Sequence, residues 1–481
     1  MGLSSELCFL TAVELRGLVR RRDVSVTEVV AAHLDRIGQV NPTLNAIVSL
    51  VDDRAREIAG TQDALLAKGT DPGPLAGLPI AHKDLFDTQG IRTTHGSPIH
   101  ADNVPTRNAL IVERSQRAGA IPLGKTNTPE FGVGSHTFNP VFGHTRNPHA
   151  QDRTCGGSSG GAAVALAARM LPIADGSDTG GSLRNPASFC NVVGLRTTPG
   201  RVPIWPNVDP WASLGVQGPM GRTVDDVALL LSVIAGPDER SALSIEVPGD
   251  NFFPLPERDF EGVRLAWSRD IGGLPVERDV RDVLTRALPT FDILGARVDE
   301  TFPDLSDAGE VFHVLRALVF AAGFRAIIEA NPDKVKQTIV WNTEIGLALS
   351  ARDVVAANRR RGELYHQVRE FMQDYEFLLC PVTQVLPFPL DWEYPTEIEG
   401  VEMASYIDWM QSCSRISILG LPAISVPAGF SAEGLPVGLQ IVGRHGDELG
   451  VLQLARAFER ATEHWRQVPA GLDTVKTDGD T

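Results

Sequence analysis

Apolar residues recur at helical spacing in two segments near the start of the chain. Thr11 and Glu14 have the spacing of a capping box, and apolar positions then repeat every three to four residues. Residues 25–37 repeat this pattern. We therefore expect two packed helices between residues 11 and 38.

Further along, short apolar runs alternate with longer segments of helical periodicity. Such alternation predicts strands and helices in turn, and it is typical of a largely parallel sheet. The predicted strands are 46–50, 75–84, 120–125, 263–267, 296–299, 377–381, 423–427 and 437–442. The predicted helices are 52–67, 109–118, 160–170, 223–234, 275–294 and 448–462.

Other segments break the alternation. Residues 126–157 are rich in Asn, Pro, Gly and His and predict a long irregular loop, which in a compact domain is usually either functional or disordered. Helical stretches within 305–372, including 311–328 and 351–372, predict a cap over the sheet, and we place that cap within 305–400. Because no repeat or linker divides the chain, we expect one domain over residues 1–472 and a disordered tail over 473–481.

Composition narrows the class of protein. A net charge of −16 argues against nucleic acid or an anionic membrane as a partner. The five cysteines are scattered, without spacing for a metal site, which favours a reducing, cytoplasmic setting. We find no targeting segment and no apolar stretch that approaches membrane-spanning length. The expectation is a cytoplasmic protein with no membrane partner.

Two clusters of glycine and serine flank one apolar run. The first, residues 155–161, formally fits the GxSxG pattern of a hydrolase nucleophile, yet the polar residues 147–153 before it do not predict the strand that this pattern requires. A flexible loop is the alternative. The second runs from Asp178 to Ser182 and offers successive N–H groups before a hydroxyl, as an oxyanion hole needs, although a tight turn would look the same.

A serine nucleophile also needs a base. His82, His136 and His144 show no triad signature, and a lone histidine is more often structural. Lys83 lies in a predicted apolar strand of a chain that has few lysines. Burial would lower the pKa of its ammonium group and leave an amine that accepts a proton near neutral pH. A lysine that extends its head group to the surface is the ordinary alternative.

With these residues in place, the chain resembles the amidase signature family of serine hydrolases. The motifs that carry the resemblance are Gly77-Leu-Pro-Ile-Ala-His-Lys-Asp84, Gly156-Gly-Ser-Ser-Gly-Gly161, Asp178-Thr-Gly-Gly-Ser-Leu-Arg184, residues 193–203 and residues 217–224. The resemblance is strong over residues 75–231 and returns weakly at 420–423 and 436–443. It implies a three-layer α/β/α fold with a central mixed β-sheet.

The resemblance also implies roles for individual residues. Ser182 is the expected nucleophile, Ser158 the relay beside a cis peptide bond at Gly157, and Lys83 the base. The oxyanion hole would use the backbone N–H groups of Thr179, Gly180, Gly181 and Ser182. Supporting roles are implied for Ser159, Asp178 and Arg184. No metal and no organic cofactor is expected.

The implied reaction is hydrolysis of a C–N bond next to a carbonyl, in amides and anilides first and in esters and carbamates (urethanes) next. For substrate contacts we single out Phe131, Gly157 and Trp205. The other aromatic residues of the less similar segments could line a pocket, but core packing is the commoner role. These are Phe138, Phe142, Trp211, Trp341, Trp392 and Trp409.

Three alternatives remain open. Urethane hydrolysis could be the main activity of the same site. The chain could be the glutaminase subunit of a tRNA-dependent amidotransferase, although the Tyr-rich helical segment of that subunit is missing near the middle of the chain. An inactive binding protein is a third, against which stands the presence of Lys83, Ser158 and Ser182. A homodimer is neither indicated nor excluded by the sequence.

Overall fold

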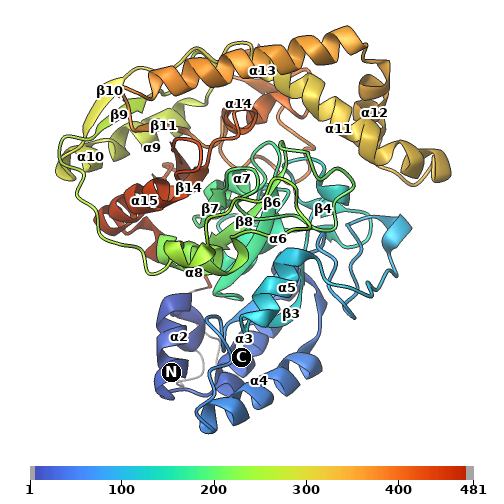
Figure 1. The fold of residues 1–481 in the computed structure, drawn as a ribbon, viewed down its shortest axis with the longest axis vertical. Coiled ribbons are helices and arrows are strands. Elements are labelled where there is room, and N and C mark those ends of the chain that lie inside the picture. Colours follow the sequence, from blue (N-terminus) through green and yellow to red (C-terminus); the bar gives the residue numbers. More distant parts are fainter. Residues whose placement is uncertain (1–5, 473–481) are drawn as a thin grey trace.

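The computed structural model describes residues 6–472, and the predicted tail at 473–481 lies outside the described residues. Its centre is a sheet of eight strands in the order β10-β9-β11-β15-β14-β7-β8-β6 (Figure 1). In chain order these strands are β6 (Ile173–Asp178), β7 (Val193–Arg196), β8 (Val216–Gly221), β9 (Arg264–Trp267), β10 (Arg297–Glu300), β11 (Phe377–Pro381), β14 (Ala423–Phe430) and β15 (Pro436–Val442).

The sheet is mixed, as the family resemblance implied, but the expectation of a largely parallel sheet is wrong. Antiparallel pairs join β6 through β8, β7, β14 and β15 to β11, and only β11, β9 and β10 run parallel. The physical reason lies in the connections. Parallel neighbours need a crossover, which α9 and α10 supply between β9 and β10, whereas residues 431–435 join β14 directly to its neighbour β15.

A second, three-stranded sheet has the order β1-β3-β2, with β1 (Ile47–Leu50), β2 (Pro79–Lys83) and β3 (Ile121–Thr126). β2 and β3 are parallel, and β1 and β3 are antiparallel. Three N-terminal helices accompany this sheet in the lower part of Figure 1, namely α2 (Ala12–Arg21), α3 (Val26–Leu44) and α4 (Asp52–Ala67). β2 lies against β6, so the small sheet abuts one edge of the large one.

Helix ends follow local chemistry. The predicted capping box of α2 is confirmed, since Thr11 and Glu14 satisfy each other's backbone N–H groups. The second helix is longer than predicted, because α3 continues past residue 38 and through Pro42 to Leu44. It stops at Asn45, which adopts the left-handed conformation while its N–H donates to the Asn41 carbonyl at 2.7 Å.

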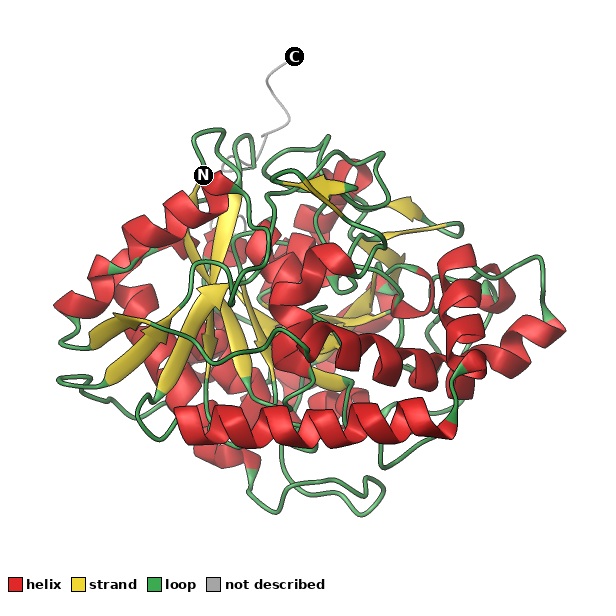
Figure 2. Cartoon of the chain, turned by 90° about the horizontal axis from the view of Figure 1, so that it is seen from above, coloured by secondary structure: helices red, strands yellow, loops and turns green. Residues whose placement is uncertain are grey.

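Helices cover both faces of the large sheet (Figure 2). A Cβ on Gly438 in β15 would meet Ser188 of α7, whereas a Cβ on Gly443, directly after β15, would meet Val451 of α15. Positions an odd number of residues apart along a strand point to opposite faces, so α7 and α15 lie on opposite faces of the sheet. The helices outside the N-terminal group and the cap are α5 (Leu110–Arg117), α6 (Gly160–Ala167), α7 (Arg184–Phe189), α8 (Val224–Ile234), α9 (Arg278–Ala287), α10 (Pro289–Ile293), α14 (Gln411–Ser417) and α15 (Glu448–Thr462). The predicted helix 275–294 is therefore split before Pro289.

Three helices make up the helical part of the segment predicted to cap the sheet: α11 (Ala308–Ala330), α12 (Gln337–Ala348) and α13 (Ala351–Phe371). They lie at the top of Figure 1. α11 overturns the expectation that no apolar stretch approaches membrane-spanning length, since its mean hydropathy reaches 1.8 with only 33% of that window buried. It nevertheless packs against α12, α13 and α14.

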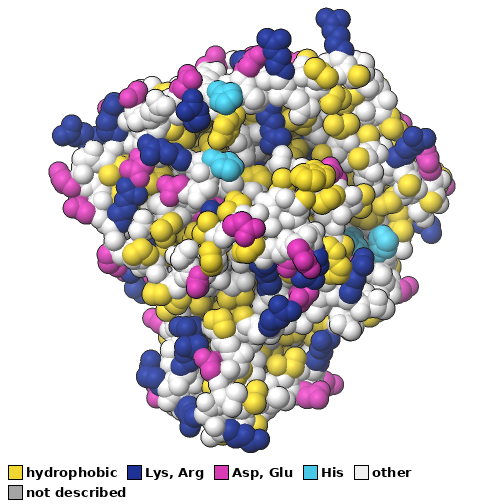
Figure 3. Space-filling view, viewed as in Figure 1, with side chains coloured by type: hydrophobic (Ala, Val, Ile, Leu, Met, Phe, Trp, Pro, Cys, Tyr) yellow, Lys and Arg dark blue, Asp and Glu magenta, His cyan; other side chains and the backbone are white. Residues whose placement is uncertain are grey.

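Apolar side chains are exposed on this cap. Figure 3 shows hydrophobic residues gathered over the part of the surface where α11 to α13 lie. The exposed large ones on these helices are Leu318, Val319, Trp341, Ile345, Leu347 and Val355. Scattered single residues of this kind are ordinary, whereas large contiguous apolar patches are uncommon on monomeric proteins.

The predicted irregular loop at 126–157 is largely irregular. It holds a 3-10 turn at Glu130–Gly132 and two short paired strands, β4 (Phe138–Asn139) and β5 (Gly143–His144). A second short pair, β12 (Glu397–Ile398) and β13 (Val401–Glu402), lies between β11 and α14 along the chain. The loop at 126–157 joins β3 to α6 and so connects the two sheets.

Candidate active site

Lys83 is the last residue of β2, and its side chain is fully buried. Its Nζ lies 2.7 Å from Ser158 Oγ, 2.9 Å from Ser159 Oγ and 3.1 Å from Ser177 Oγ. Three hydroxyl acceptors match the three hydrogens of an ammonium group. A neutral amine has one hydrogen fewer, so one of these hydroxyls must then donate to Nζ, and the shortest contact is that of Ser158.

The charge state of Lys83 is set mainly by burial. Burial lowers the pKa of Lys83 from 10.5 to about 7, although the carboxylates of Asp178 and Asp175 act in the opposite direction. A substantial fraction of the molecules therefore carries the neutral amine near neutral pH, and this fraction increases with pH. The ordinary alternative, a surface lysine, is excluded by this position.

The first glycine and serine cluster, residues 155–161, packs closely against earlier residues of the loop at 126–157. The peptide bond between Gly157 and Ser158 is cis, as the resemblance implied. The Gly157 carbonyl accepts from Ser135 Oγ at 3.1 Å, and the Gly156 carbonyl accepts from Thr137 Oγ1 at 2.8 Å. α6 begins directly after the two serines. A Cβ on Gly161 would lie 2.3 Å from the Asn127 nitrogen, so only glycine permits this approach.

The second cluster forms the turn between β6 and α7. Gly181, at φ 120°, donates its N–H to Asp178 Oδ1 at 2.9 Å, and Leu183 donates to Oδ2 at 3.2 Å. The Ser182 carbonyl accepts from the Ser159 N–H at 3.2 Å, which brings the two clusters together. The half-buried Ser182 hydroxyl takes part in none of these contacts.

The four predicted oxyanion donors are not equivalent. The N–H of Gly181 is engaged by Asp178 at 2.9 Å. Within residues 6–472, the N–H groups of Thr179, Gly180 and Ser182 have no hydrogen-bond acceptor. Three donors thus remain available on one turn beside the Ser182 hydroxyl.

A buried ion pair fixes this turn. Asp178 accepts from Arg184 Nε at 3.0 Å and Nη2 at 2.9 Å, and from Arg196 Nη1 at 3.1 Å. Burial alone would raise the pKa of Asp178, but the two guanidinium groups hold it well below its usual value. Arg184 further donates to Gln440 Oε1 at 2.5 Å and Ser417 Oγ at 2.7 Å. The turn is therefore anchored to β15 and α14.

Replacing Arg184 with methionine should destabilise the protein by about 3 kcal/mol or more, because it leaves the buried Asp178 with only one cation. Urea unfolding followed by circular dichroism measures this. Arg240→Met is the matched control, since Arg240 pairs with Asp238 at a partly exposed site, where such a pair contributes about 1 kcal/mol at most. Equal losses in the two variants would contradict the anchoring role.

Phe131 lies next to the site. It occupies the 3-10 turn Glu130–Gly132 with φ 50°, and its ring contacts Phe324 of α11 at 5.4 Å between centroids. A Cβ on the following Gly132 would lie 3.5 Å from Ser158 Oγ. The turn thus connects the relay serine with the cap.

Trp205 is placed differently. The guanidinium carbons of Arg107 and Arg240 lie 5.2 and 4.9 Å from the centre of its ring. Within the described residues, no aromatic pair joins Trp205 to Phe131. Of the other aromatic residues, Trp409 is buried between Phe189 and Phe388 and packs in the core, whereas Trp211, Trp341 and Trp392 are exposed.

Sequence reasoning missed several residues of the site. Ser177 and Asp175 lie on β6, which was not predicted as a strand because residues 173–178 mix apolar and polar types. Phe312 of α11 and Met410 lie over the oxyanion turn, because a Cβ on Gly180 would come within 2.8 Å of the Phe312 ring and 3.5 Å of Met410 Cε. The alternation of Asp175 and Ser177 on one side of a strand was the available signal.

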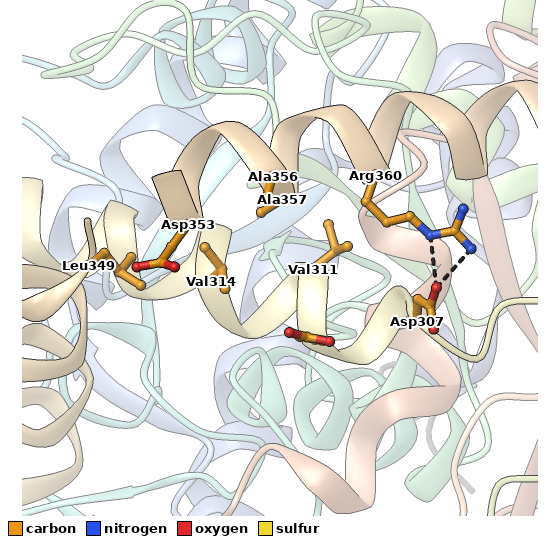
Figure 4. A pocket seen from close by; sticks show the side chains of 9 residues that line it. Asp307, Val311, Val314, Leu349, Asp353, Ala356, Ala357 and Arg360 are labelled. Carbon is orange, nitrogen blue, oxygen red and sulfur yellow. Dashed lines mark hydrogen bonds and ion pairs between the residues drawn. The ribbon is translucent and has the colours of Figure 1, made fainter. Parts of the chain in front are cut away.

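Other polar clusters and cavities lie apart from these residues. Within residues 6–472, no group of three or more His, Cys, Asp or Glu side chains is placed to hold a metal ion. A cavity of about 260 Å³ lies between α11 and α13, where Asp307 and Arg360 form an ion pair (Figure 4). None of the residues predicted for the site lines it.

Comparison with known proteins places these motifs in a wider group. The family model described as Amidase matches residues 28–452. The acylamidase of Rhodococcus erythropolis is 37% identical over 95% of this chain and 96% of its own length. The glutamyl-tRNA(Gln) amidotransferase subunit of Moorella thermoacetica is 37% identical too, over 96% and 99%. The crystal structure of a bacterial aryl acylamidase of the amidase signature enzymes superposes with a TM-score of 0.89 at 30% identity, covering 96% and 99%.

Proposed function

This chain belongs to the amidase signature family and is thus a hydrolase acting on C–N bonds, and we propose that it cleaves amides through an acyl-enzyme formed on Ser182. The observation that carries the proposal is the fully buried Lys83 amine, 2.7 Å from Ser158 Oγ and with a pKa near 7. A buried amine of this kind accepts protons at neutral pH without a histidine.

The proposed reaction begins with neutral Lys83. Nζ accepts the proton of Ser158, and Ser158 accepts that of Ser182, so that Ser182 Oγ attacks the carbonyl carbon of the substrate. The carbonyl π electrons move onto oxygen and form a tetrahedral oxyanion. The free N–H groups of Thr179, Gly180 and Ser182 stabilise this charge, and Asp178 fixes their turn by holding Gly181.

The second half of the reaction returns the protons. The C–N bond breaks as the leaving nitrogen receives a proton from Ser158. The Lys83 ammonium group then returns a proton to Ser158. Water then attacks the acyl-enzyme, gives a proton to the same relay, and releases the acid with Ser182 restored. Both half-reactions thus use one base in both directions.

Apolar side chains suggest the substrate class. Phe312 and Met410 lie over Gly180, and the Phe131 turn lies beside Ser158. Such walls favour uncharged acyl or aryl groups on either side of the scissile bond. Small aryl or alkyl amides are therefore the proposed substrates, and esters and carbamates would react by the same route.

Replacing Phe312 with alanine should widen the acyl side of the site. We expect the ratio of kcat/KM for a bulky acyl anilide to that for acetanilide to rise about tenfold, as removing a ring from an apolar pocket does. Competition between the two substrates, read by mass spectrometry, measures the ratio. Leu318→Ala on the exposed side of the same helix is the control, and an unchanged ratio in Phe312→Ala would show that this ring does not face the substrate.

The experiment that tests the proposed function is a panel of amides, anilides, esters and carbamates incubated with the full chain. Products are read by mass spectrometry, and a quenched reaction is digested to find the acyl group on the peptide that contains Ser182. Amide hydrolysis with this adduct supports the proposal. Faster carbamate than amide turnover would make urethane hydrolysis the main activity, and an adduct elsewhere would contradict the assignment of Ser182.

A second candidate is the glutaminase subunit of an amidotransferase. Two observations favour it: the chain is as similar to the Moorella amidotransferase protein as to the Rhodococcus acylamidase, and α11 to α13 expose apolar side chains that a partner could cover. Release of ammonia from glutamine that depends on a co-purifying partner would support this candidate. Hydrolysis of anilides by the isolated chain, without glutaminase activity, would exclude it.

A further inference from the structure

Lys83 and Ser182 belong to different sheets. β2, which ends at Lys83, is the outer strand of the three-stranded sheet, because it pairs only with β3. β6, which leads into the turn of Ser182, is the outer strand of the eight-stranded sheet, because it pairs only with β8. The two edges lie against each other. No backbone hydrogen bonds of a sheet join β2 to β6. The distance between the base and the nucleophile therefore depends on the side-chain contacts between these two strands.

The Lys83 backbone N–H faces this junction. Successive N–H groups of a strand point to opposite edges. The N–H of Asp84 donates to the carbonyl of Thr126, the last residue of β3, so the N–H of Lys83 points away from β3. It donates to Asp175 Oδ1, on β6, at 2.9 Å. A side chain of the large sheet thus satisfies an edge donor of the small one.

Asp175 makes a second contact across the same junction. Its Oδ2 accepts from Nδ1 of His82 at 2.5 Å, and both side chains are fully buried. Burying a carboxylate is costly unless its oxygens are hydrogen-bonded, and here both are. Two positions along β6, on the same side of the strand, Ser177 Oγ contacts Lys83 Nζ. β6 therefore holds both the backbone and the head group of Lys83.

We propose that Asp175 is a positioning residue that ties the sheet of Lys83 to the sheet of Ser182 and so sets the Lys83 amine against Ser158. The inference rests on the proposed function only in taking Lys83 as the base. The hydrogen bond between the Lys83 N–H and the Asp175 carboxylate can be tested without a substrate.

The charges around Lys83 decide how the tie affects pH dependence. Asp178 and Asp175 both raise the pKa of Lys83 against the larger effect of burial. On the neighbouring strand β3, Lys125 is also buried. Burial lowers the pKa of Lys125, and the carboxylates of Asp84 and Asp175 act in the opposite direction. His82 adjoins on β2. Removing the charge of Asp175 removes one carboxylate that favours the ammonium form, so the pKa of Lys83 falls further.

Two variants separate the charge from the hydrogen bond. In Asp175→Asn, the amide oxygen still accepts from the Lys83 N–H, but the charge is lost. In Asp175→Leu, both are lost. We expect the ascending limb of kcat/KM against pH to move down by about one unit in each variant. The plateau rate should fall about tenfold in Asp175→Asn and about a hundredfold in Asp175→Leu, where the base is displaced.

Hydrogen exchange supplies the readout that needs no activity. Mass spectrometry of peptides overlapping residues 79–86 should show faster exchange of the Lys83 amide in Asp175→Leu, by about tenfold or more, and near-parental protection in Asp175→Asn. Asp226→Asn is the matched control, since Asp226 is equally buried but accepts from the Val13 N–H at 3.2 Å and caps α8. Asp226→Asn should change neither the position of the ascending limb of kcat/KM against pH nor the exchange rate of the Lys83 amide.

Two results would overturn the inference. One is a Lys83 amide that remains protected in Asp175→Leu. The other is a limb that stays where the parent has it in both Asp175 variants, or that Asp226→Asn moves as far. Failure of the proposed function looks different: the parent then hydrolyses no amide, while the exchange of the Lys83 amide still decides whether Asp175 forms the tie.

Discussion

Ser182→Ala is expected to lower kcat/KM for an anilide by at least about 10⁴-fold, because the proposed acyl-enzyme forms on the hydroxyl that this change removes. The change should leave substrate binding largely intact, since the carbonyl still meets the N–H groups of Thr179 and Gly180. The loss should therefore appear in kcat and not in KM. Steady-state kinetics on purified parent and variant measure it, and the acyl adduct should vanish from the digested peptide.

Ser188→Ala is the matched control for this experiment. Ser188 lies on α7, six residues beyond Ser182, and its Oγ accepts from the Gly438 N–H at 2.8 Å. Its loss should lower stability by about 1 kcal/mol and leave the rate near that of the parent. A Ser182→Ala variant that retains a tenth of the parental rate would remove Ser182 from the role of nucleophile.

Lys83→Met should lower kcat/KM by about 10³-fold, the usual contribution of a positioned general base. In the parent, only the neutral amine accepts a proton, and its fraction increases with pH. The rate should therefore rise through a midpoint near pH 7, set by the pKa of about 7, and level off above pH 8. In Lys83→Met this limb should be missing. Rates from pH 5.5 to 9 measure both effects.

Lys125→Met provides the comparison, because Lys125 is the other fully buried lysine within residues 6–472 and lies on the neighbouring strand β3. Its Nζ contacts the Phe86 carbonyl and Thr88 Oγ1 at 2.8 Å, not the catalytic serines. Stability should fall in this variant, while the folded fraction keeps the limb near pH 7. If the rise in rate near pH 7 shifted in Lys125→Met but persisted in Lys83→Met, the titrating group would be Lys125 and not Lys83.

Much of the site could be predicted because its chemistry lies in short local motifs. Lys83 was singled out by its residue type and neighbours, whereas the roles of Ser158 and Asp178 came from the family resemblance of their motifs. The structure brings these residues close together. The contacts of Ser177 and Asp175 could not be foreseen in the same way. They depend on how the outer strands of two sheets meet, and residues 173–178 lack the apolar alternation that would have marked β6 as a strand.

The sheet shows a similar division. Most strands were located from apolar runs, but their direction depends on connections. Residues 197–215, between β7 and β8, contain no helix, and β14 turns directly into β15, so these strands are antiparallel. Phe312 and Met410 were missed for another reason. They reach Gly180 from more than a hundred residues away along the chain, in a segment without recognisable motifs.

The anchoring of Arg184 bears on how the enzyme is made. Its guanidinium group is held by Ser417 and Gln440, which are 233 and 256 positions later in the chain. Ribosomes add about 5–20 residues per second, so a nascent chain spends many seconds with its oxyanion turn lacking these partners. Contacts of such long separation also form late in folding. We therefore expect the early motifs to be synthesised before they can act, and hydrolysis to begin only after α14 and β15 have been made and have packed against the oxyanion turn.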